Sequence, residues 1–420
     1  MPLPLGSPSG PASPGSLLLR DVRPWARSLS EPAVDVLVLE GRIAAGGRDL
    51  EAPVGITVEH GDGALLLPSF SDVHAHLDST RLGLPFREHT AQPDLAGLVE
   101  NDRRHWREAG ATVAERATYT LGRTIAYGAT VVRTHAQIDP DSGLDRLDGV
   151  LAAREHHRGR AEVQVVAFPQ AGVLRSPGTE DLLEQALLAG ADLVGGIDPC
   201  AFDRDPVSHL DVIFGLAERH DTGVDIHLHE SGDLGAFTIE LVCERVRALS
   251  MPGLVTISHC FALSTVDPER QRALADMLAE HDVAVTTVAP GTRDPLPLSL
   301  LQSAGVRVGL GQDGTRDYWS PYGNGDMLDR AWQLAYRAGY RADALVESCV
   351  EVATLGGRAV ICGAGGAPSR PERGLAVGDP ADLVVVPADT VTAAVMDRPS
   401  RRLVVHEGRV VARDGELATG

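Results

Sequence analysis

Eight short apolar runs alternate with helix-like stretches through the middle of the chain, and this rhythm restricts the fold more than any other feature. The runs are ALLLPSF, ATVVRTH, VQVVAFP, DLVGGID, GVDIHLHE, LVTISHC, VAVTTVA and VRVGLGQD. Continuous apolar strands that alternate with helices are typical of a parallel sheet covered by helices. Eight such units over about 250 residues favour an α/β fold of the (β/α)8 TIM barrel type. The alternative is a doubly wound open sheet, but its GxGxxG signature is not visible after the first run.

The two ends of the chain have a different pattern. DVLVLEGRIAAGG near the start, and ADLVVVPAD and RLVVHEGRVVARDG near the end, are short apolar runs broken by glycine, as in hairpins. We predict that residues 17–66 and 366–420 together form a small β-sandwich domain and that residues 67–365 form the barrel. Residues 1–16 are rich in Pro, Ser and Gly, which predicts a disordered leader and not a signal peptide.

Composition excludes several classes of function. The net charge of −20 disfavours binding to nucleic acid and to anionic membranes. No apolar stretch approaches the ~20 residues that cross a bilayer, and the five cysteines lack CxxC spacing. We therefore expect a cytoplasmic protein with a small-molecule substrate and no nucleic-acid or membrane partner; homo-oligomerisation stays open. The chain contains no lysine, which excludes Schiff-base catalysis and a lysine-carbamate bridge between two metals.

Seven of the eight runs end in side chains that can bind a metal or a substrate. These residues are His74, His76, His135, Gln170, Asp198, His227, His229, Glu230, His259 and Asp313. The carboxyl ends of barrel strands meet at one mouth, where active sites lie. His74 and His76 are two residues apart, so in a strand they point to the same face. Buried polar groups need partners, and a metal with its substrate can supply them for the whole set.

Imidazole and carboxylate ligands suit Zn²⁺ or Fe²⁺, and the ligand type does not choose between them. Three or four protein ligands leave a position for water, whose pKa then falls to about 7. Glu230 is placed to carry a proton from that water to a leaving group. The alternative for Glu230 is a solvent-exposed residue at the start of a helix.

At this point the chain resembles the amidohydrolase superfamily, and within it the cytosine deaminase-like branch, over roughly residues 35–415. The HxH pair, VVAFPQAGVL, DIHLHE, ISHC and GQDGTRDYW occur in the order of that family. The resemblance implies one divalent metal ion, Zn or Fe, bound by His74, His76, His227 and Asp313. It implies catalytic roles for Glu230 as the proton shuttle, for His259 and for Asp313, and substrate contacts for Gln170, His229 and Trp319. It leaves His135 and Asp198 without a role.

The resemblance also implies a reaction. Metal-bound hydroxide would attack an aminated N-heterocycle, cytosine-like or larger, and release ammonia. The alternatives are opening of a cyclic amide, removal of an N-alkyl amine, or a catalytically silent barrel that binds a ligand. Gly314 stands where cytosine deaminases carry a second aspartate, which removes an acceptor, opens space and makes cytosine itself doubtful. Arg293 and Arg316, on the last two loops, are candidates to meet a substrate carboxylate, or are simply solvated.

Overall fold

The computed structural model describes residues 3, 15–25, 30–90, 94–291, 293–363 and 373–418. Most of the predicted leader, residues 1–16, lies outside the described residues. Of its two last residues, Gly15 donates a backbone hydrogen bond to the Glu407 carbonyl at 2.7 Å. The predicted disorder of the leader stays a prediction.

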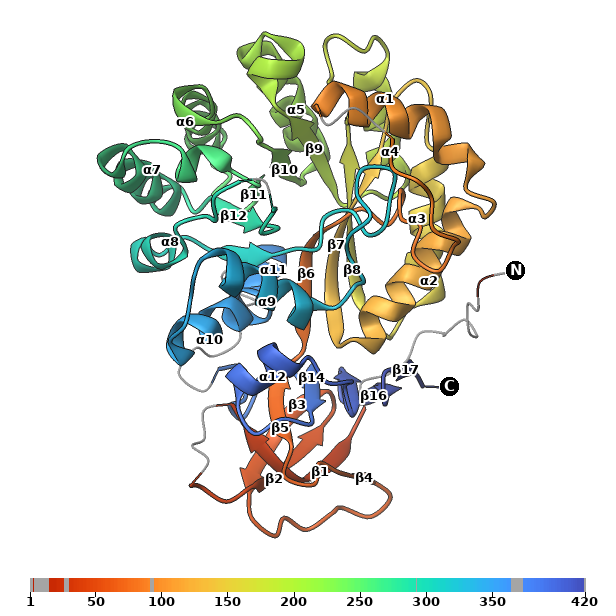
Figure 1. The fold of residues 1–420 in the computed structure, drawn as a ribbon, viewed down its shortest axis with the longest axis vertical. Helices are drawn as coiled ribbons and strands as arrows, with labels where there is room; N and C mark the ends of the chain where they lie inside the picture. The colour runs from red at the N-terminus through yellow and green to blue at the C-terminus, as the bar shows by residue number, and fades with distance from the viewer. Residues whose placement is uncertain are drawn as a thin grey trace.

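Eight parallel strands form a barrel, as the sequence predicted (Figure 1). They are β6 (Phe70–Ala75), β7 (Ala129–Gln137), β8 (Glu162–Phe168), β9 (Leu193–Ile197), β10 (Gly223–His227), β11 (Val255–Ser258), β12 (Ala284–Thr287) and β13 (Val308–Leu310). Each strand pairs with the next one in the chain. The barrel closes between β13 and β6 through a parallel bridge of Ala75 with Asp313, in which the Asp313 N–H donates to the His74 carbonyl at 2.7 Å.

Helices surround the barrel (Figure 1). They are α1 (Leu95–His105), α2 (Val113–Ala126), α3 (Asp145–His156), α4 (Thr179–Ala189), α5 (Pro206–His220), α6 (Gly232–Leu249), α7 (Pro268–Glu280), α8 (Leu298–Ala304), α9 (Met327–Arg337), α10 (Asp343–Val352) and α11 (Leu355–Cys362). A further helix, α12 (Val391–Asp397), packs against α9 and α10. Their starts follow from the sequence: a Thr112–Glu115 capping box begins α2, and Asp205 and Asp267, each followed by proline, cap α5 and α7. Among the described helices, none is long and apolar enough to cross a membrane.

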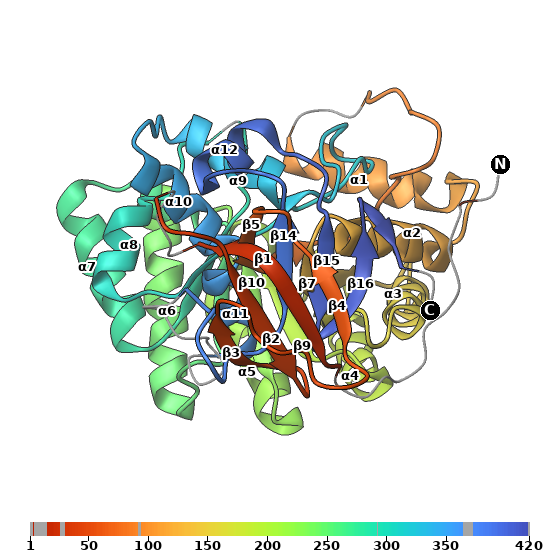
Figure 2. The same cartoon turned by 90° about the horizontal axis from the view of Figure 1, so that it is seen from below.

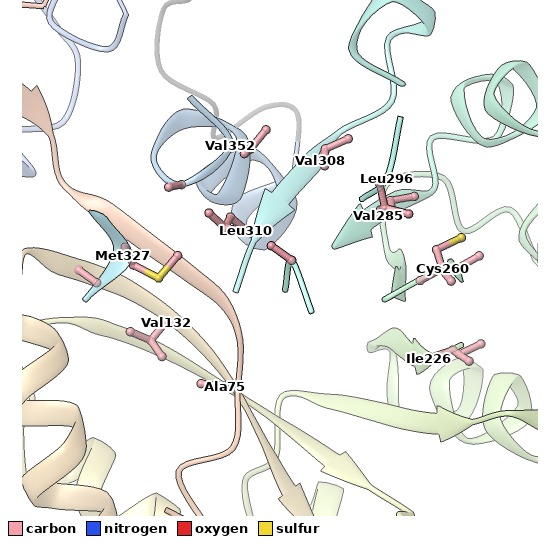
Figure 3. Close-up of a cluster of buried hydrophobic side chains, with 14 of the residues drawn as sticks. Ala75, Val132, Ile226, Cys260, Val285, Leu296, Val308, Leu310, Met327 and Val352 are labelled. Carbon is pink, nitrogen blue, oxygen red and sulfur yellow. The ribbon is translucent and has the colours of Figure 1, made fainter. Parts of the chain in front are cut away.

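The main hydrophobic core lies between the strands and these helices. Figure 3 shows part of it, with Val132, Ile226, Val285 and Leu310 from four barrel strands among the labelled side chains. These strand residues are fully buried, which explains why the runs are continuously apolar instead of alternating. The core therefore fixes the strands and, with them, the positions of the polar residues at their carboxyl ends.

A second, mixed sheet is built from both ends of the chain (Figure 2). Its strands are β1 (Leu17–Pro24), β2 (Val34–Leu39), β3 (Arg42–Gly47), β4 (Thr57–His60), β5 (Leu65–Pro68), β14 (Leu383–Val386), β15 (Leu403–His406), β16 (Arg409–Arg413) and β17 (Glu416–Leu417). The antiparallel pair of β5 and β14 joins the amino-terminal part to the carboxy-terminal part. Strands from both parts share a separate small hydrophobic core. The two ends of the chain therefore form one small β-structure, as the sequence predicted.

One element assignment from the sequence was wrong. The run ALLLPSF was taken as the first barrel strand, but its residues Leu65–Pro68 form β5 of the second sheet. The barrel begins only at Phe70, after the single residue Ser69. Strand β5 also crosses the predicted boundary between residues 66 and 67, and the division into domains stays a prediction.

Candidate active site

Histidine side chains from three strands meet at the mouth of the barrel. The ligand nitrogens of His74, His76, His135 and His227 all lie within 4.8 Å of one another. The Nε2 atoms of His76 and His227 are 3.4 Å apart. A second group within the same limit contains His74, His259 and the carboxylate of Asp313. The sequence prediction that these strand ends gather at one place is therefore correct.

The Asp313 carboxylate faces the histidines across the seam of the barrel. Its Oδ1 atom lies 3.8 Å from His74 Nε2 and 3.5 Å from His76 Nε2. The side chain is 40% exposed, so the carboxylate borders the open mouth. Burial favours the neutral acid, but the imidazoles of His259 and His76 outweigh it and lower the pKa of Asp313. A carboxylate and several imidazoles thus share one small volume.

The chemistry of these donors fits a divalent metal. His74 is fully buried, and its Nε2 atom has no hydrogen-bond partner among the described residues. Burial, reinforced by the neighbouring imidazoles, lowers the pKa of His74 and of His227 well below the ordinary value. Neutral imidazoles with unused lone pairs beside a carboxylate are the donor set that metals such as zinc require.

A buried polar network behind His74 fixes the orientation of that ring. Ser258 Oγ donates to Asp225 Oδ1 at 2.7 Å, so it acts as an acceptor toward His74 Nδ1, 3.0 Å away. Arg133 Nη1 holds the other oxygen of Asp225 at 2.9 Å. This arrangement places the proton of His74 on Nδ1 and leaves the Nε2 lone pair free, as partners behind metal-binding histidines commonly do.

Sequence reasoning missed this network and a second carboxylate, Asp72. Asp72 Oδ1 accepts the Gln312 N–H at 3.0 Å and so ties β6 to the segment that carries Asp313. Burial raises the pKa of Asp72 to about 7. A signal was available: Asp72 precedes His74, and Asp225 precedes His227, by two residues, so each acid shares the face of a strand with a histidine.

Glu230 is buried beside the mouth and held by three donors. Its Oε1 atom accepts the N–H groups of Cys200 and Ala201 at 2.8 and 2.9 Å, and its Oε2 atom accepts the Thr238 hydroxyl at 2.6 Å. Burial raises the pKa of Glu230. In the described part of the chain, no hydrogen bond or ion pair joins Glu230 to the histidine cluster. The sequence alternative of a solvent-exposed helix start is wrong, because Glu230 is 5% exposed.

His229 and His259 lie side by side, with ring centroids 4.3 Å apart. Burial works against a charged His229, but the Asp198 carboxylate, 2.7 Å from its Nδ1 atom, outweighs burial and raises the pKa of His229. Burial lowers the pKa of His259 to about 3. The backbone of Asp198, His259 and Asp313 is left-handed, with φ of 34°, 66° and 64°. Each of these turns follows the end of a barrel strand.

The other two predicted substrate residues take different positions. Gln170 is buried two residues after the end of β8, and its backbone N–H donates to the carbonyl of Phe168 at 3.1 Å. The Phe168 ring stacks on His227 with 3.9 Å between centroids, so Gln170 lies near the cluster. Trp319 is half-buried and packs against Trp106 and its neighbours in a small apolar cluster. The described side-chain contacts of Trp319 lie in that cluster and not with the histidines.

Gly314 does not open space in the site, contrary to the expectation from the sequence. A Cβ atom built on Gly314 would lie 1.8 Å from Asp317 Oδ2 and 2.7 Å from Asp317 Cγ. Asp317 is 3% exposed, and its Oδ1 atom accepts the N–H groups of Trp319 and Ser320 at 2.8 Å each. Burial raises the pKa of Asp317 to about 7. A carboxyl group therefore fills the space beside Asp313 that a side chain at position 314 would need.

The two arginines on the last loops both stack on aromatic rings. The Arg293 guanidinium lies 5.6 Å from the ring centroid of Phe261, which itself lies 5.5 Å from His259. The Arg316 guanidinium lies 5.5 Å from the ring of Phe86. Arg293 is thus near the mouth, whereas the described contacts of Arg316 lie with the exposed Phe86.

Comparisons with known proteins agree with this geometry. An isopropylaminohydrolase of N-isopropylammelide from Burkholderia multivorans has a crystal structure that matches with a TM-score of 0.89 and 43% identity, covering 96% of this chain and all of the other. A 5-methylcytosine deaminase from Klebsiella pneumoniae, with 5-fluorocytosine bound, matches with a TM-score of 0.80 and 25% identity over 94% of this chain and 97% of that one. The N-isopropylammelide isopropyl amidohydrolase of Pseudomonas sp. (strain ADP) is 27% identical over 92% of this chain and 95% of its own length.

The family model for the amidohydrolase family matches residues 61–412, which include both sides of the barrel seam and every residue of the candidate site. The resemblance noted in the sequence is therefore confirmed. Members of this family are metal-dependent enzymes that act on small molecules. The chain belongs to the amidohydrolase family and is a hydrolase of carbon–nitrogen bonds other than peptide bonds.

Proposed function

We propose that this enzyme binds one divalent metal ion, Zn or Fe, and hydrolyses the bond between a ring carbon and an exocyclic amine of an N-heterocycle. The observation that carries the proposal is the convergence of four imidazoles at the mouth of the barrel, with the Asp313 carboxylate close to two of them. The metal ligands are His74, His76, His227 and Asp313. When bound, such a metal lowers the pKa of a coordinated water to about 7 and supplies a nucleophile at neutral pH.

Glu230 moves the proton in this proposal. Its buried carboxyl group has a raised pKa, which brings its proton affinity closer to neutral pH, where general acid–base catalysis works best. It accepts the proton lost by the nucleophile and gives it to the amine nitrogen, because an amine does not leave as its strongly basic anion. His259 and Asp313 border the same volume and orient the attacking oxygen.

Substrate recognition falls to the residues around the cluster. Gln170 and His229 hydrogen-bond to the polar edge of the ring, and Trp319 borders the pocket. The relatives named above act on N-isopropylammelide and 5-methylcytosine, which supports a substituted nitrogen ring as the substrate. Ammonia is the first candidate for the amine released. An alkylamine is the second candidate, favoured by the 43% identity to an isopropylaminohydrolase.

The five unpaired cysteines support a cytoplasmic location for this reaction. The experiment that tests the function is a panel of cytosine, 5-methylcytosine and N-isopropylammelide, incubated with enzyme loaded with zinc or with ferrous iron. Ammonia and isopropylamine are measured separately, and Glu230→Gln serves as the control for background hydrolysis. Release of isopropylamine alone would select the second candidate. If enzyme fully loaded with metal releases neither amine, the alternative of a catalytically silent barrel that binds a ligand is favoured instead.

A further inference from the structure

Asp198 directs its whole carboxylate to the two residues that follow the metal-binding strand β10. Its Oδ1 atom accepts the N–H groups of His229 and Glu230 at 2.6 and 3.2 Å. Its Oδ2 atom lies 2.7 Å from His229 Nδ1. The residue is 1% exposed and has φ of 34°, a left-handed conformation that costs energy outside glycine. A surface acid that merely caps a turn would need neither this burial nor this conformation.

The bond to His229 determines which ring nitrogen carries the proton. A carboxylate only accepts hydrogen bonds, so His229 Nδ1 keeps its proton whether the imidazole is neutral or charged. The other nitrogen, Nε2, lies on the opposite side of the ring, away from Asp198. The ring itself lies 4.3 Å from that of His259. Asp198 therefore fixes both the orientation and the proton pattern of His229.

Asp198 also begins the turn that holds Glu230. The Phe202 N–H donates to the Asp198 carbonyl at 2.9 Å, which closes the turn η2 (Pro199–Asp203) directly after β9. This turn supplies the Cys200 and Ala201 N–H groups that bind Glu230 Oε1. Asp198 thus acts on Glu230 in two ways. Its side chain binds the backbone N–H of Glu230, and its backbone carbonyl closes the turn whose two N–H groups bind the Glu230 carboxylate.

We propose that Asp198 is a positioning residue of the reaction. It holds His229 with Nε2 turned toward the substrate, and it keeps the Glu230 carboxylate on the N–H groups of Cys200 and Ala201. This inference rests on the proposed function, in which His229 contacts the substrate and Glu230 moves the proton. Asp198 acts through these two residues and touches no reacting atom.

The test substitutes Asp198→Asn. Asparagine keeps an oxygen for the N–H groups of His229 and Glu230 but presents an NH₂ group, a donor, where His229 Nδ1–H needs an acceptor. We expect kcat for amine release to fall about 10–100-fold, the usual effect of removing such a partner. We expect KM to stay within about threefold, and the metal content and thermal midpoint to be unchanged. An unchanged kcat would overturn the proposal.

Asp203→Asn is a matched control in the same turn. Asp203 is 6% exposed and pairs with a histidine in the same manner, its Oδ2 atom 2.6 Å from His209 Nδ1, but this pair faces α5 and not the mouth. We expect kcat to remain within about threefold of wild type even if the thermal midpoint falls. An equal loss of kcat in both variants would overturn the proposal, because the effect would then belong to the turn as a whole and not to Asp198.

A double-mutant cycle separates the two routes of action. In the His229→Ala background, Asp198→Asn should reduce kcat by less than about threefold if Asp198 acts mainly through the imidazole. A loss as large as in wild type would overturn the part of the proposal that concerns His229.

The last readout needs no turnover. Nitrogen-15 NMR of the zinc-loaded enzyme at pH 9, with His229→Ala used to assign the signal, should show His229 protonated on Nδ1 and, in Asp198→Asn, on Nε2. The same tautomer in both proteins would overturn the proposal. If the His229 tautomer differs between the two proteins in this way but wild type releases no amine from any substrate, the proposed function has failed, while the inference that Asp198 positions His229 stands.

Discussion

Replacement of Gly314 by alanine should destabilise the protein, although glycine-to-alanine changes outside turns often stabilise. The new Cβ atom would lie 1.8 Å from Asp317 Oδ2, and real Cβ contacts essentially never fall below 3.0 Å, so this oxygen must retreat by about 1.2 Å. Rotation of the carboxyl group about its own bond does not suffice, because Cγ lies only 2.7 Å away and must also move. The whole Asp317 side chain has to leave its position.

The cost follows from what holds Asp317 in place. Its Oδ1 atom accepts the N–H groups of Trp319 and Ser320, and a typical hydrogen bond of this kind is worth about 0.5–1.5 kcal/mol. Overpacking of a filled site costs about 1–3 kcal/mol on its own. Loss of the two hydrogen bonds and overpacking of the site each cost this much, so we expect a loss of about 1–3 kcal/mol in the free energy of unfolding. Gly314→Asp should cost more, because it places a second carboxylate against the first.

The assay is urea unfolding of four proteins: wild type, Gly314→Ala, Asp317→Ala and the double variant. Removing the Asp317 carboxylate should lower the cost of Gly314→Ala by at least about 1 kcal/mol. Gly46→Ala, in β3, is the matched control, because nothing lies within 4 Å of the Cβ atom there. It should change stability by less than about 0.5 kcal/mol. If Gly314→Ala behaves like Gly46→Ala, Asp317 does not occupy this space.

Three further predictions concern the metal, the proton and pH. Wild type should hold about one metal ion per chain, and His74→Ala and Asp313→Ala should lose it. His60→Ala, on the exposed end of β4, is the control and should keep the metal. Elemental analysis that finds undiminished metal in the first two variants would refute the ligand assignment. Glu230→Gln should keep its metal but lose about 10²–10⁴-fold in kcat, and a loss below threefold would point to His229 or His259 as the shuttle. Burial lowers the pKa of His157 to about 4 from 6.5, so between these pH values the unfolded chain binds the proton first and acid destabilises the fold. From pH 7 to pH 5 wild type should therefore lose on the order of 2 kcal/mol more stability than His157→Gln, and equal losses in urea titrations would contradict this.

The barrel was predictable because its strands are buried on both faces and so appear in the sequence as continuous apolar runs. The same property explains why one strand was assigned to the wrong sheet. Leu65–Pro68 and Phe70–Ala75 are both fully buried and separated only by Ser69, so no polar or turn residue marks where the chain leaves one sheet and enters the other.

The candidate site was predictable only as far as strand ends reveal it. His74, His227 and Asp313 end three runs, and the barrel topology alone brings them together. Thr238 was not predictable, since it lies in the middle of α6 and reaches Glu230 only through packing. Asp317 was not predictable either, because the sequence shows that Gly314 lacks a side chain but not which neighbour fills the space.

The left-handed backbone at Asp198, His259 and Asp313 has a consequence for how this lineage can drift. An L-residue in this conformation costs roughly 1–2 kcal/mol that glycine does not incur. At Asp313, whose side chain is 40% exposed, selection for stability alone would therefore favour glycine. At Asp198 and His259 it would not, because these side chains are buried and the Asp198 carboxylate accepts the N–H groups of His229 and Glu230. Populations evolved for thermal tolerance without the substrate should therefore replace Asp313 early, and populations that depend on the substrate should keep it.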